Sequence, residues 1–355
     1  MADRYSPLNA LQNGHWFKLI CGASFQHLPA IRTLALVYTL AGADCIDVAA
    51  DSAAIYAARS GVEAAQALLE ANGSEAIRQV WLMASLNDGE DPHFRKAVFD
   101  PQHCPPDCPQ PCVSICPAQA IAFSPSQSGV MAERCYGCGR CLPICPVGQI
   151  ETRSQPATPA SIQPLVREGI VSALELHTQV GHEAEFQHLW QQIQPALEHL
   201  KVLAVSCPDG EGALAYLSTL YDLMKPLPCP LVWQTDGRPM SGDIGDGATR
   251  ATINYGERVL RSPLPGFVQL AGGTNRHTVP KLKERGLLKS AASELGSARP
   301  WIAGVAYGSY ARSLLSDIQV RLEAMPQSSF RLEDYPDLLG DGVDLAAQLI
   351  APLKG

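Results

Sequence analysis

Eight of the chain's 12 cysteines lie between Cys104 and Cys145. Dense disulfide frameworks belong mainly to small secreted domains, whereas crowded cysteines in a long intracellular chain usually bind metal. The chain has 355 residues, and its segment Met1–Gly14 shows neither an apolar signal core nor an Ala-x-Ala cleavage site. We therefore expect a cytoplasmic protein whose cysteine-rich segment holds a metal cofactor rather than disulfides.

The eight cysteines form two runs of four, and each run ends in Cys-Pro. Residues 135–146 read C-x2-C-x2-C-x3-C-P, and residues 104–117 read C-x3-C-x3-C-x3-C-P. The first of these patterns is that of bacterial ferredoxins, in which three thiolates of one run and the fourth of the other hold each cluster. A zinc ribbon, the alternative, needs only four ligands in all. The pattern therefore predicts two [4Fe–4S] clusters.

The crossed arrangement gives each fourth cysteine to the opposite cluster. One ligand set is then Cys116, Cys135, Cys138 and Cys141, and the other is Cys104, Cys108, Cys112 and Cys145. The run that starts at Cys104 has wider, proline-filled gaps, so we expect its cluster to be labile or to be a [3Fe–4S] cluster. The remaining cysteines are expected to pack as small apolar side chains, namely Cys21, Cys45, Cys207 and Cys229.

Outside the cysteine-rich segment, short apolar strands alternate with helical patterns. Strands are predicted at 17–21, 45–49, 79–84, 170–177, 202–206, 231–234, 267–270 and 302–305. Helices are predicted at 28–41, 52–71, 183–200, 212–224, 248–260, 278–285 and 311–322, with a last one near 343–353. Alternating units of this kind indicate a parallel sheet, and eight of them fit a closed (β/α)8 barrel. An open doubly wound sheet is the alternative.

The break in this alternation divides the chain. We expect a first part of the barrel at 15–99, a ferredoxin-like iron–sulfur insert at 100–155, a second part of the barrel at 156–325 and a C-terminal tail at 326–355. The fold is thus an α/β (β/α)8-barrel-like scaffold with an inserted α+β bacterial-type two-cluster ferredoxin module. The insert stands in the third βα loop, on the face of the barrel where active sites lie.

Polar residues follow several of the predicted strands and are candidates for the barrel mouth. They are Ser24, Asp47, Asp51, Asn87, Glu175, His177, Asp209, Asp236, Arg238, Asn275 and Arg312. The chain carries no H-E-x-x-H, P-loop or G-x-S-x-G motif, and no acid–base pair at short spacing stands out. The acidic, glycine-rich loop 235–243 is the most distinctive segment among them, and the sequence leans away from an enzyme.

Glycines after the last two predicted strands indicate a phosphate site. Gly272 and Gly273 follow one strand, and Gly308, Ser309 and Arg312 follow the next. In many barrels a ligand phosphate sits between these two loops, against backbone N–H groups. The prediction is a bound phosphate or flavin mononucleotide, and the alternative is that these glycines only permit tight turns.

The net charge of the chain limits the kinds of partner that it can bind. The chain carries 27 Lys+Arg against 35 Asp+Glu, for a formal net charge of -8. Phosphate contacts need a basic surface, so nucleic acid is a poor candidate. The longest apolar stretch, 31–50, contains Arg32, Asp44 and Asp47, and we expect no integral membrane segment.

One segment downstream of the cysteine runs reduces the number of families that fit the sequence. Residues 233–245 read Trp-Gln-Thr-Asp-Gly-Arg-Pro-Met-Ser-Gly-Asp-Ile-Gly. Together with the two cysteine runs, this segment resembles the light-dependent period proteins of cyanobacteria, over nearly the whole chain. The resemblance implies an iron–sulfur protein that senses redox state in the input to the circadian clock. It also implies a cytoplasmic location, with clock oscillator proteins and an input histidine kinase as partners.

The residues themselves leave other functions open. The first is an iron–sulfur oxidoreductase in which the insert feeds electrons to a flavin or phosphorylated ligand in the barrel mouth. The second is a plain electron-transfer protein or scaffold.

Overall fold

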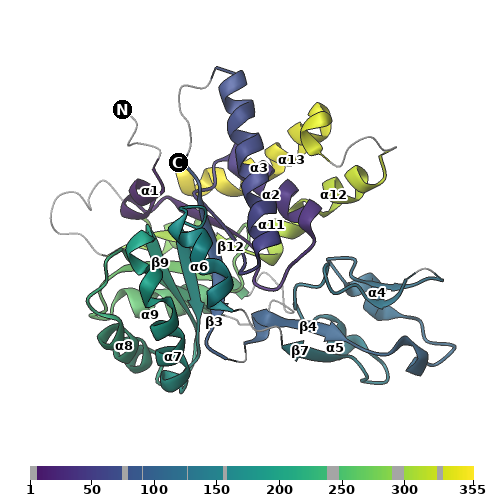
Figure 1. Ribbon diagram of the computed structural model, residues 1–355, viewed down its shortest axis with the longest axis horizontal. Helices are drawn as coiled ribbons and strands as arrows, with labels where there is room; N and C mark the ends of the chain where they lie inside the picture. The colour runs from purple at the N-terminus through teal and green to yellow at the C-terminus, as the bar shows by residue number, and fades with distance from the viewer. Residues whose placement is uncertain are drawn as a thin grey trace.

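Eight parallel strands close into a barrel in the computed structural model, which describes residues 6–73, 79–89, 91–125, 127–154, 158–237, 248–289, 300–325 and 331–355. In order around the barrel they are β1 (Trp16–Gly22), β2 (Cys45–Ala49), β3 (Trp81–Asn87), β8 (Ala173–His177), β9 (Val202–Pro208), β10 (Leu231–Asp236), β11 (Phe267–Ala271) and β12 (Gly304–Tyr307). Strand β1 pairs with both β2 and β12, so the sheet has no free edge. The predicted (β/α)8 barrel is confirmed, and the open sheet is excluded (Figure 1).

Helices follow the strands and cover the outside of the barrel. They are α2 (Leu28–Ala41), α3 (Ser52–Ala71), α6 (Pro159–Arg167), α7 (Glu183–Ile193), α8 (Ala213–Met224), α9 (Ala248–Leu260), α10 (Thr278–Glu284) and α11 (Ser309–Leu314). The helix predicted over 183–200 ends at Ile193 and continues as a 3-10 segment, Gln194–His199. Pro195 explains the change, because proline lacks the N–H that an α-helix needs in its interior.

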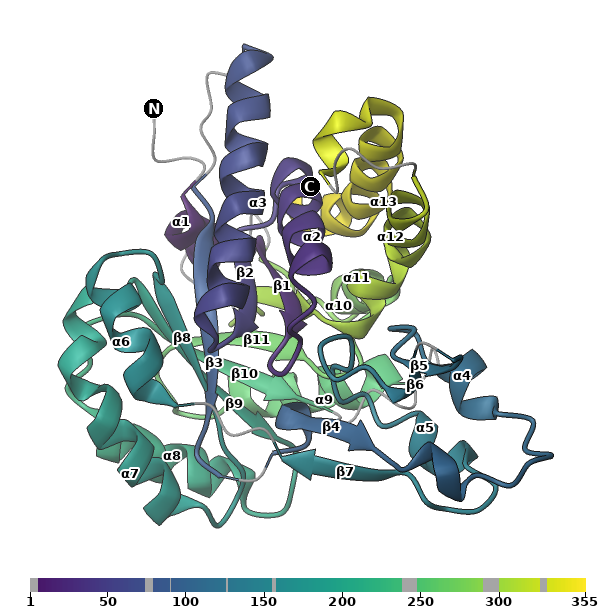
Figure 2. The same cartoon turned by 45° about the vertical axis from the view of Figure 1, so that its right-hand side comes forward.

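The end of the chain packs against its beginning. The segment 326–355, expected to be a tail, contains the 19-residue helix α13 (Pro336–Lys354), which follows α12 (Ser316–Glu323). Figure 2 shows α13 beside α2, and a Cβ on Gly342 would lie 3.5 Å from a methyl group of Val37. The ammonium group of Lys354 pairs with Asp44 at 2.5 Å, which ties α13 to the turn before β2.

An apolar plug fills the N-terminal end of the barrel. The rings of Trp16 and Trp81 meet edge to face with centroids 5.7 Å apart, and Met83 and Val232 belong to the same buried cluster. Helix α1 (Pro7–Asn13) lies against this plug and buries Leu11 completely. Polar side chains therefore occupy only the other half of the barrel interior.

The insert leaves the barrel after β3 and returns through α6. Strands β4 (Arg95–Val98) and β7 (Glu151–Ser154) pair antiparallel and form its stem. Beyond the stem lie α4 (Pro111–Ile115), the hairpin of β5 (Ile121–Phe123) and β6 (Ser128–Val130), and α5 (Cys141–Ile144). Figure 1 shows the insert as an arm that projects from one side of the barrel, with α4 far from it. Strand β4 lies before residue 100, so the stem begins upstream of the first cysteine run.

Helices α2 and α3 touch through a buried glycine in the middle of α3. A Cβ on Gly61 would lie 2.3 Å from the carbonyl oxygen of Arg32 and 2.9 Å from the Cβ of Ala35. Real side chains do not approach so closely, so only glycine permits this contact.

We expect Gly61→Ala to destabilise the protein. Alanine normally stabilises a helix interior by about 0.5–1 kcal/mol relative to glycine, but overpacking of this kind costs about 1–3 kcal/mol. Gly340→Ala is the matched control, because Gly340 is an exposed position of α13 with no atom within 4 Å of an added Cβ. That substitution should stabilise the protein. Urea unfolding followed by circular dichroism measures both, and shifts in the same direction would contradict the α2–α3 contact.

Candidate functional site

Four cysteines from both runs line one cavity in the insert. Cys116 ends α4, Cys135 and Cys138 lie in the loop before α5, and Cys141 begins α5. Burial raises the pKa of Cys141 to about 12, and the thiols of Cys138, Cys135 and Cys116 add to this rise. The four sulfur atoms therefore lie close enough to repel one another when charged, as the ligands of one cluster must.

The other four cysteines gather in a second group. Burial raises the pKa of Cys112, its own backbone N–H opposes the rise, and the neighbouring thiols of Cys104, Cys108 and Cys145 add to it. Only Cys112 of this group is buried, whereas two cysteines of the first group are, Cys135 and Cys141. Each run thus sends its fourth cysteine to the other group, as the crossed spacing predicts.

Hydrogen-bond donors reach sulfur atoms in both groups. The backbone N–H of Ala120 donates to Sγ of Cys116 at 3.2 Å, and the side-chain amide of Gln149 donates to Sγ of Cys104 at 2.8 Å. Such donors stabilise the negative charge of thiolates and of clusters. Two sets of four thiols with nearby N–H groups have the donor chemistry that an iron–sulfur cofactor needs.

Tyr136 connects the first cysteine group to the barrel. Its ring lies beneath the guanidinium group of Arg312, 3.9 Å from Cζ to the ring centroid, and meets the ring of Phe25 edge to face at 5.8 Å. Gly22 ends β1 with φ +124, and a Cβ there would lie 3.4 Å from the Cβ of Tyr136. The positive φ favours glycine at this position, and the insert lies in van der Waals contact with the barrel here.

The predicted phosphate residues lie at the ends of two neighbouring strands. Gly272 and Gly273 follow β11, and their carbonyl groups accept hydrogen bonds from Thr252 and Thr249 of α9. Gly308 and Ser309 follow β12 and begin α11, a helix of six residues. The guanidinium group of Arg312 donates to the carbonyl oxygen of Ile20 at 2.7 Å and to Oγ of Ser309 at 3.1 Å. Arg312 is therefore engaged within the protein.

A charged cluster occupies the middle of the barrel. Lys18 of β1 is fully buried. Its ammonium group pairs with Glu175 of β8 and lies 3.4 Å from the carboxylate of Asp47 of β2. Burial lowers the pKa of Lys18, but the two carboxylates outweigh burial and raise it above its usual value. Burial raises the pKa of Asp47 to about 6 despite Lys18, while Lys18 and His177 hold the pKa of Glu175 low. The hydroxyl of Ser85 donates to Asp47 at 2.7 Å.

Amide side chains extend this cluster toward the apolar plug. Gln234 donates to Glu175 at 2.5 Å and to the hydroxyl of Ser206 at 3.1 Å. Gln269 donates to Gln234 at 2.5 Å, and the indole N–H of Trp16 donates to Gln269 at 2.5 Å. The polar interior is thus a chain of hydrogen bonds that crosses the barrel.

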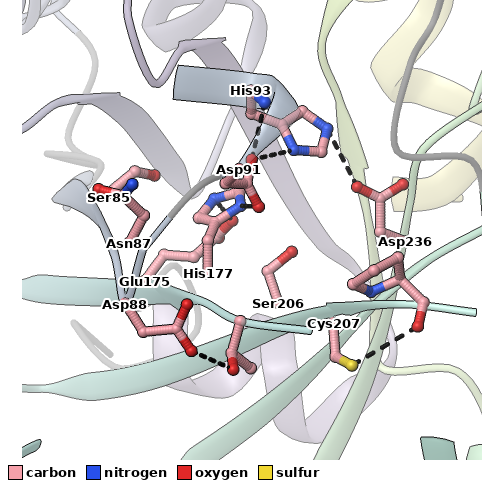
Figure 3. A network of polar contacts seen from close by, with 12 residues as sticks. Ser85, Asn87, Asp88, Asp91, His93, Glu175, His177, Ser206, Cys207 and Asp236 are labelled. Atoms are coloured by element: carbon pink, nitrogen blue, oxygen red, sulfur yellow. Dashed lines mark hydrogen bonds and ion pairs between the residues drawn. The ribbon is translucent and has the colours of Figure 1, made fainter. Parts of the chain in front are cut away.

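Two histidines extend the same network toward the mouth (Figure 3). Nε2 of His177 lies 2.8 Å from Glu175, and its Nδ1 lies 3.7 Å from Asp91. His93 contacts Asp91 at 2.9 Å through Nδ1 and Asp236 at 3.1 Å through Nε2. Burial lowers the pKa of His177, but its bonds to Asp91 and Glu175 outweigh burial and raise it to about 9.

Only some of the polar residues predicted at the mouth meet there. Those that the network joins are Asp47, Glu175, His177 and Asp236. The others make contacts outside this network: Asp51 caps α3, Asp209 pairs with Arg258, Asn87 donates to the carbonyl of Gly89, Asn275 accepts from the N–H of His277, and Ser24 donates to the carbonyl of Arg95. Arg238 and most of the loop 235–243 lie outside the described residues.

Sequence reasoning missed much of the network, including its charged members Lys18 and Asp91, the histidine His93, and the amides Gln234 and Gln269. A signal existed for Lys18, because a lysine in the middle of an apolar parallel strand needs a buried partner. Asp91 and His93 gave none, since they lie between a strand and the insert without a recognisable spacing.

The comparisons with known proteins agree on one family. Residues 104–156 match the LdpA Fe-S cluster-binding domain, and residues 165–352 match the Light dependent period A C-terminal domain. The chain is therefore an iron–sulfur cluster-binding protein built on a (β/α)8 barrel. It is 50% identical over 348 residues to Light dependent period A of Synechococcus elongatus, which covers 98% of this chain and 94% of the relative. The chain thus belongs to the Light dependent period A family, and its resemblance to that family is confirmed.

Solved structures show a more distant likeness. (S)-3-O-geranylgeranylglyceryl phosphate synthase from Thermoplasma acidophilum is 13% identical, with a TM-score of 0.37 over 98% of this chain and 96% of that chain. Wild-type GGGPS from Thermoplasma volcanium is 9% identical, with a TM-score of 0.41 over 98% and 95%. The strand pairing of this chain itself shows the closed barrel. Throughout the described residues, each helix is too short or too polar to span a bilayer.

We expect Lys18→Met to destabilise the protein by about 3–5 kcal/mol at neutral pH, because two buried carboxylates lose their cation. Without Lys18, the pKa of Asp47 rises further above its unfolded value, and that of Glu175 rises as well, although His177 still opposes this rise. The folded variant then binds more protons than the unfolded one, so its stability increases as pH falls from about 8 to 5. Denaturant unfolding across this pH range measures how far the free energy of unfolding of the variant lies below that of the native sequence. A deficit that does not shrink at low pH would show that these carboxylates are not left charged.

Proposed function

We propose that this protein senses redox state through two [4Fe–4S] clusters and passes the signal to the circadian clock as light-dependent input. Membership of the Light dependent period A family and the iron–sulfur cluster-binding domain support this assignment. One observation carries the sensing role. Tyr136, between Cys135 and Cys138, lines the cavity of the first cysteine group and stacks on Arg312 of the barrel.

In this proposal each cysteine group holds one cluster. The first set is Cys116, Cys135, Cys138 and Cys141, and the second is Cys104, Cys108, Cys112 and Cys145. When bound, a cluster supplies reversible one-electron chemistry, and its potential depends on hydrogen bonds and exposure. The greater exposure of the second set supports our expectation that its cluster is the labile one.

The chain's own residues carry the signal outward. An added negative charge beside Tyr136 attracts the guanidinium group of Arg312, which also holds the carbonyl group of Ile20 at the end of β1. A second contact lies next to it, because Arg134 pairs with Glu323 of α12 at 2.8 Å. A change at these contacts alters the surface that the insert shares with α12. We assign that surface to the partners, the clock oscillator proteins and an input histidine kinase in the cytoplasm.

A second function, an iron–sulfur oxidoreductase, is favoured by the charged barrel interior that faces the insert. It requires electron transfer to a flavin or another phosphorylated ligand in the barrel mouth. The phosphate site at Gly272, Gly273, Gly308, Ser309 and Arg312 stays a prediction, and Arg312 could join it only by giving up some of its present contacts. A flavin that copurifies with the protein would favour this alternative.

Crossed ligation predicts which cluster each variant loses. Cys116→Ala should damage the cluster of the Cys135 run, and Cys145→Ala should damage the other. Anaerobically purified protein should hold about eight irons, and electron paramagnetic resonance of the reduced protein should show a different signal missing in each variant. Cys229→Ala is the control and should keep both signals. Loss of the cluster nearest in sequence in either variant would contradict the assignment.

The clock role predicts a phenotype. In a cyanobacterium whose own copy is replaced, Cys138→Ser should abolish the dependence of the circadian period on light intensity, because the cluster beside Tyr136 is lost. Cys229→Ser, outside both cysteine groups, should preserve that dependence. Bioluminescence rhythms recorded at several light intensities provide the measurement. A normal response in Cys138→Ser cells, with iron loss verified in the purified variant, would overturn the proposal.

A further inference from the structure

Two histidines and an aspartate converge at the barrel mouth, outside the cysteine groups. Asp91 and His93 lie on the segment between β3 and β4, and His177 ends β8. One oxygen or nitrogen atom from each of the three lies within 4.8 Å of the others. Asp91 offers one oxygen to Nδ1 of His93 at 2.9 Å and the other to Nδ1 of His177 at 3.7 Å. The same ring atom of each histidine therefore faces the shared carboxylate.

The opposite nitrogen of each histidine has its own carboxylate. Nε2 of His93 lies 3.1 Å from Asp236, and Nε2 of His177 lies 2.8 Å from Glu175. A carboxylate in this position accepts a hydrogen bond from the Nε2–H, so a metal ion that displaces the Nδ1 proton can bind the Nδ1 lone pair. Histidines that bind metals almost always have such a partner on the other nitrogen. Figure 3 shows the arrangement, with His93 between Asp91 and Asp236.

We propose that Asp91, His93 and His177 bind a divalent transition-metal ion, with Asp236 and Glu175 orienting the two imidazole rings. Two imidazoles and one carboxylate suit Zn²⁺ or Fe²⁺, and they leave coordination positions for water or a ligand. The proposal is independent of the iron–sulfur clusters, because none of its residues is a cysteine.

The local charge favours a cation there. Four carboxylates surround this part of the interior, namely Asp47, Asp91, Glu175 and Asp236. The ammonium group of Lys18 faces only Asp47 and Glu175. A divalent ion that displaces protons from the two imidazoles keeps positive charge beside Asp91 and Asp236, the two carboxylates that Lys18 does not face. It also replaces separate side-chain contacts with bonds to one centre.

The metal would fix the point where the insert leaves the barrel. Phe94, next to His93, is fully buried and meets the ring of His177 edge to face at 5.2 Å. Strand β4, the first strand of the stem, begins at the next residue. The bound ion would therefore join β8 directly to the root of the insert.

To test the proposal, the anaerobic holoprotein is first treated with a chelator that leaves its iron count unchanged. It is then titrated with Zn²⁺. The native sequence should bind one equivalent by calorimetry. His93→Ala removes a ligand whose side chain is 32% exposed, so the fold should survive, and it should weaken binding by more than about 100-fold. Asp236→Asn should weaken binding by about 10–100-fold. His182→Ala is the control, because that histidine contacts Asp88 instead, and its binding should be unchanged.

Zinc K-edge absorption separates this site from the cysteine groups, since the iron–sulfur clusters contain no zinc. We expect only nitrogen and oxygen ligands, two of them imidazoles. Sulfur ligands would show that Zn²⁺ had entered a cysteine group and would overturn the assignment. Absence of saturable binding to the native sequence, or equal affinity in His93→Ala, would do the same.

Discussion

The buried ammonium group of Lys18 is the constraint on which the barrel interior depends. An isolated charge in such a place costs several kcal/mol, so Lys18 needs Glu175 and Asp47 beside it. Those carboxylates need donors in turn, which Ser85 and Gln234 provide. Most (β/α)8 barrels fill this space with branched apolar side chains. Here a hydrogen-bonded network fills it, and the network requires several strands to be in the correct register at once.

This network sets the geometry of the mouth. Glu175 accepts hydrogen bonds from both Lys18 and His177, so the position of the lysine fixes the ring that faces Asp91. Asp91 in turn holds His93, which belongs to the segment that leads into the insert. The root of the insert is therefore positioned by interactions that begin at the barrel centre.

The parts that could be predicted from sequence are those with a local signal. Apolar runs and helical periodicity predicted the barrel. Cysteine spacing predicted two crossed groups of four, because three thiolates of each expected cluster recur at short intervals. The mouth depends instead on pairs such as Glu175–Lys18 and His93–Asp236, whose members are far apart in the chain. Only the closed barrel brings them together, and single-sequence patterns cannot show this. Arg312 was predicted for a phosphate, yet its partner Tyr136 comes from the insert, which local reasoning does not place.

The insert is held to the barrel at two places of different chemistry. At its root, Asp91 and His93 join it to β8 and β10 through contacts between carboxylates and imidazoles at the barrel mouth. Nearer the cysteines, Tyr136 meets Arg312 through a cation–π contact, worth about 0.5–2 kcal/mol depending on solvation. The first attachment is part of a connected network, whereas the second consists of a few neighbouring contacts, since Tyr136 also meets Phe25 and Arg134 pairs with Glu323 of α12. In the proposed sensing role, a change of charge in the neighbouring cysteine group acts mainly at the Tyr136–Arg312 contact, while the contacts of Asp91 and His93 hold the root of the insert.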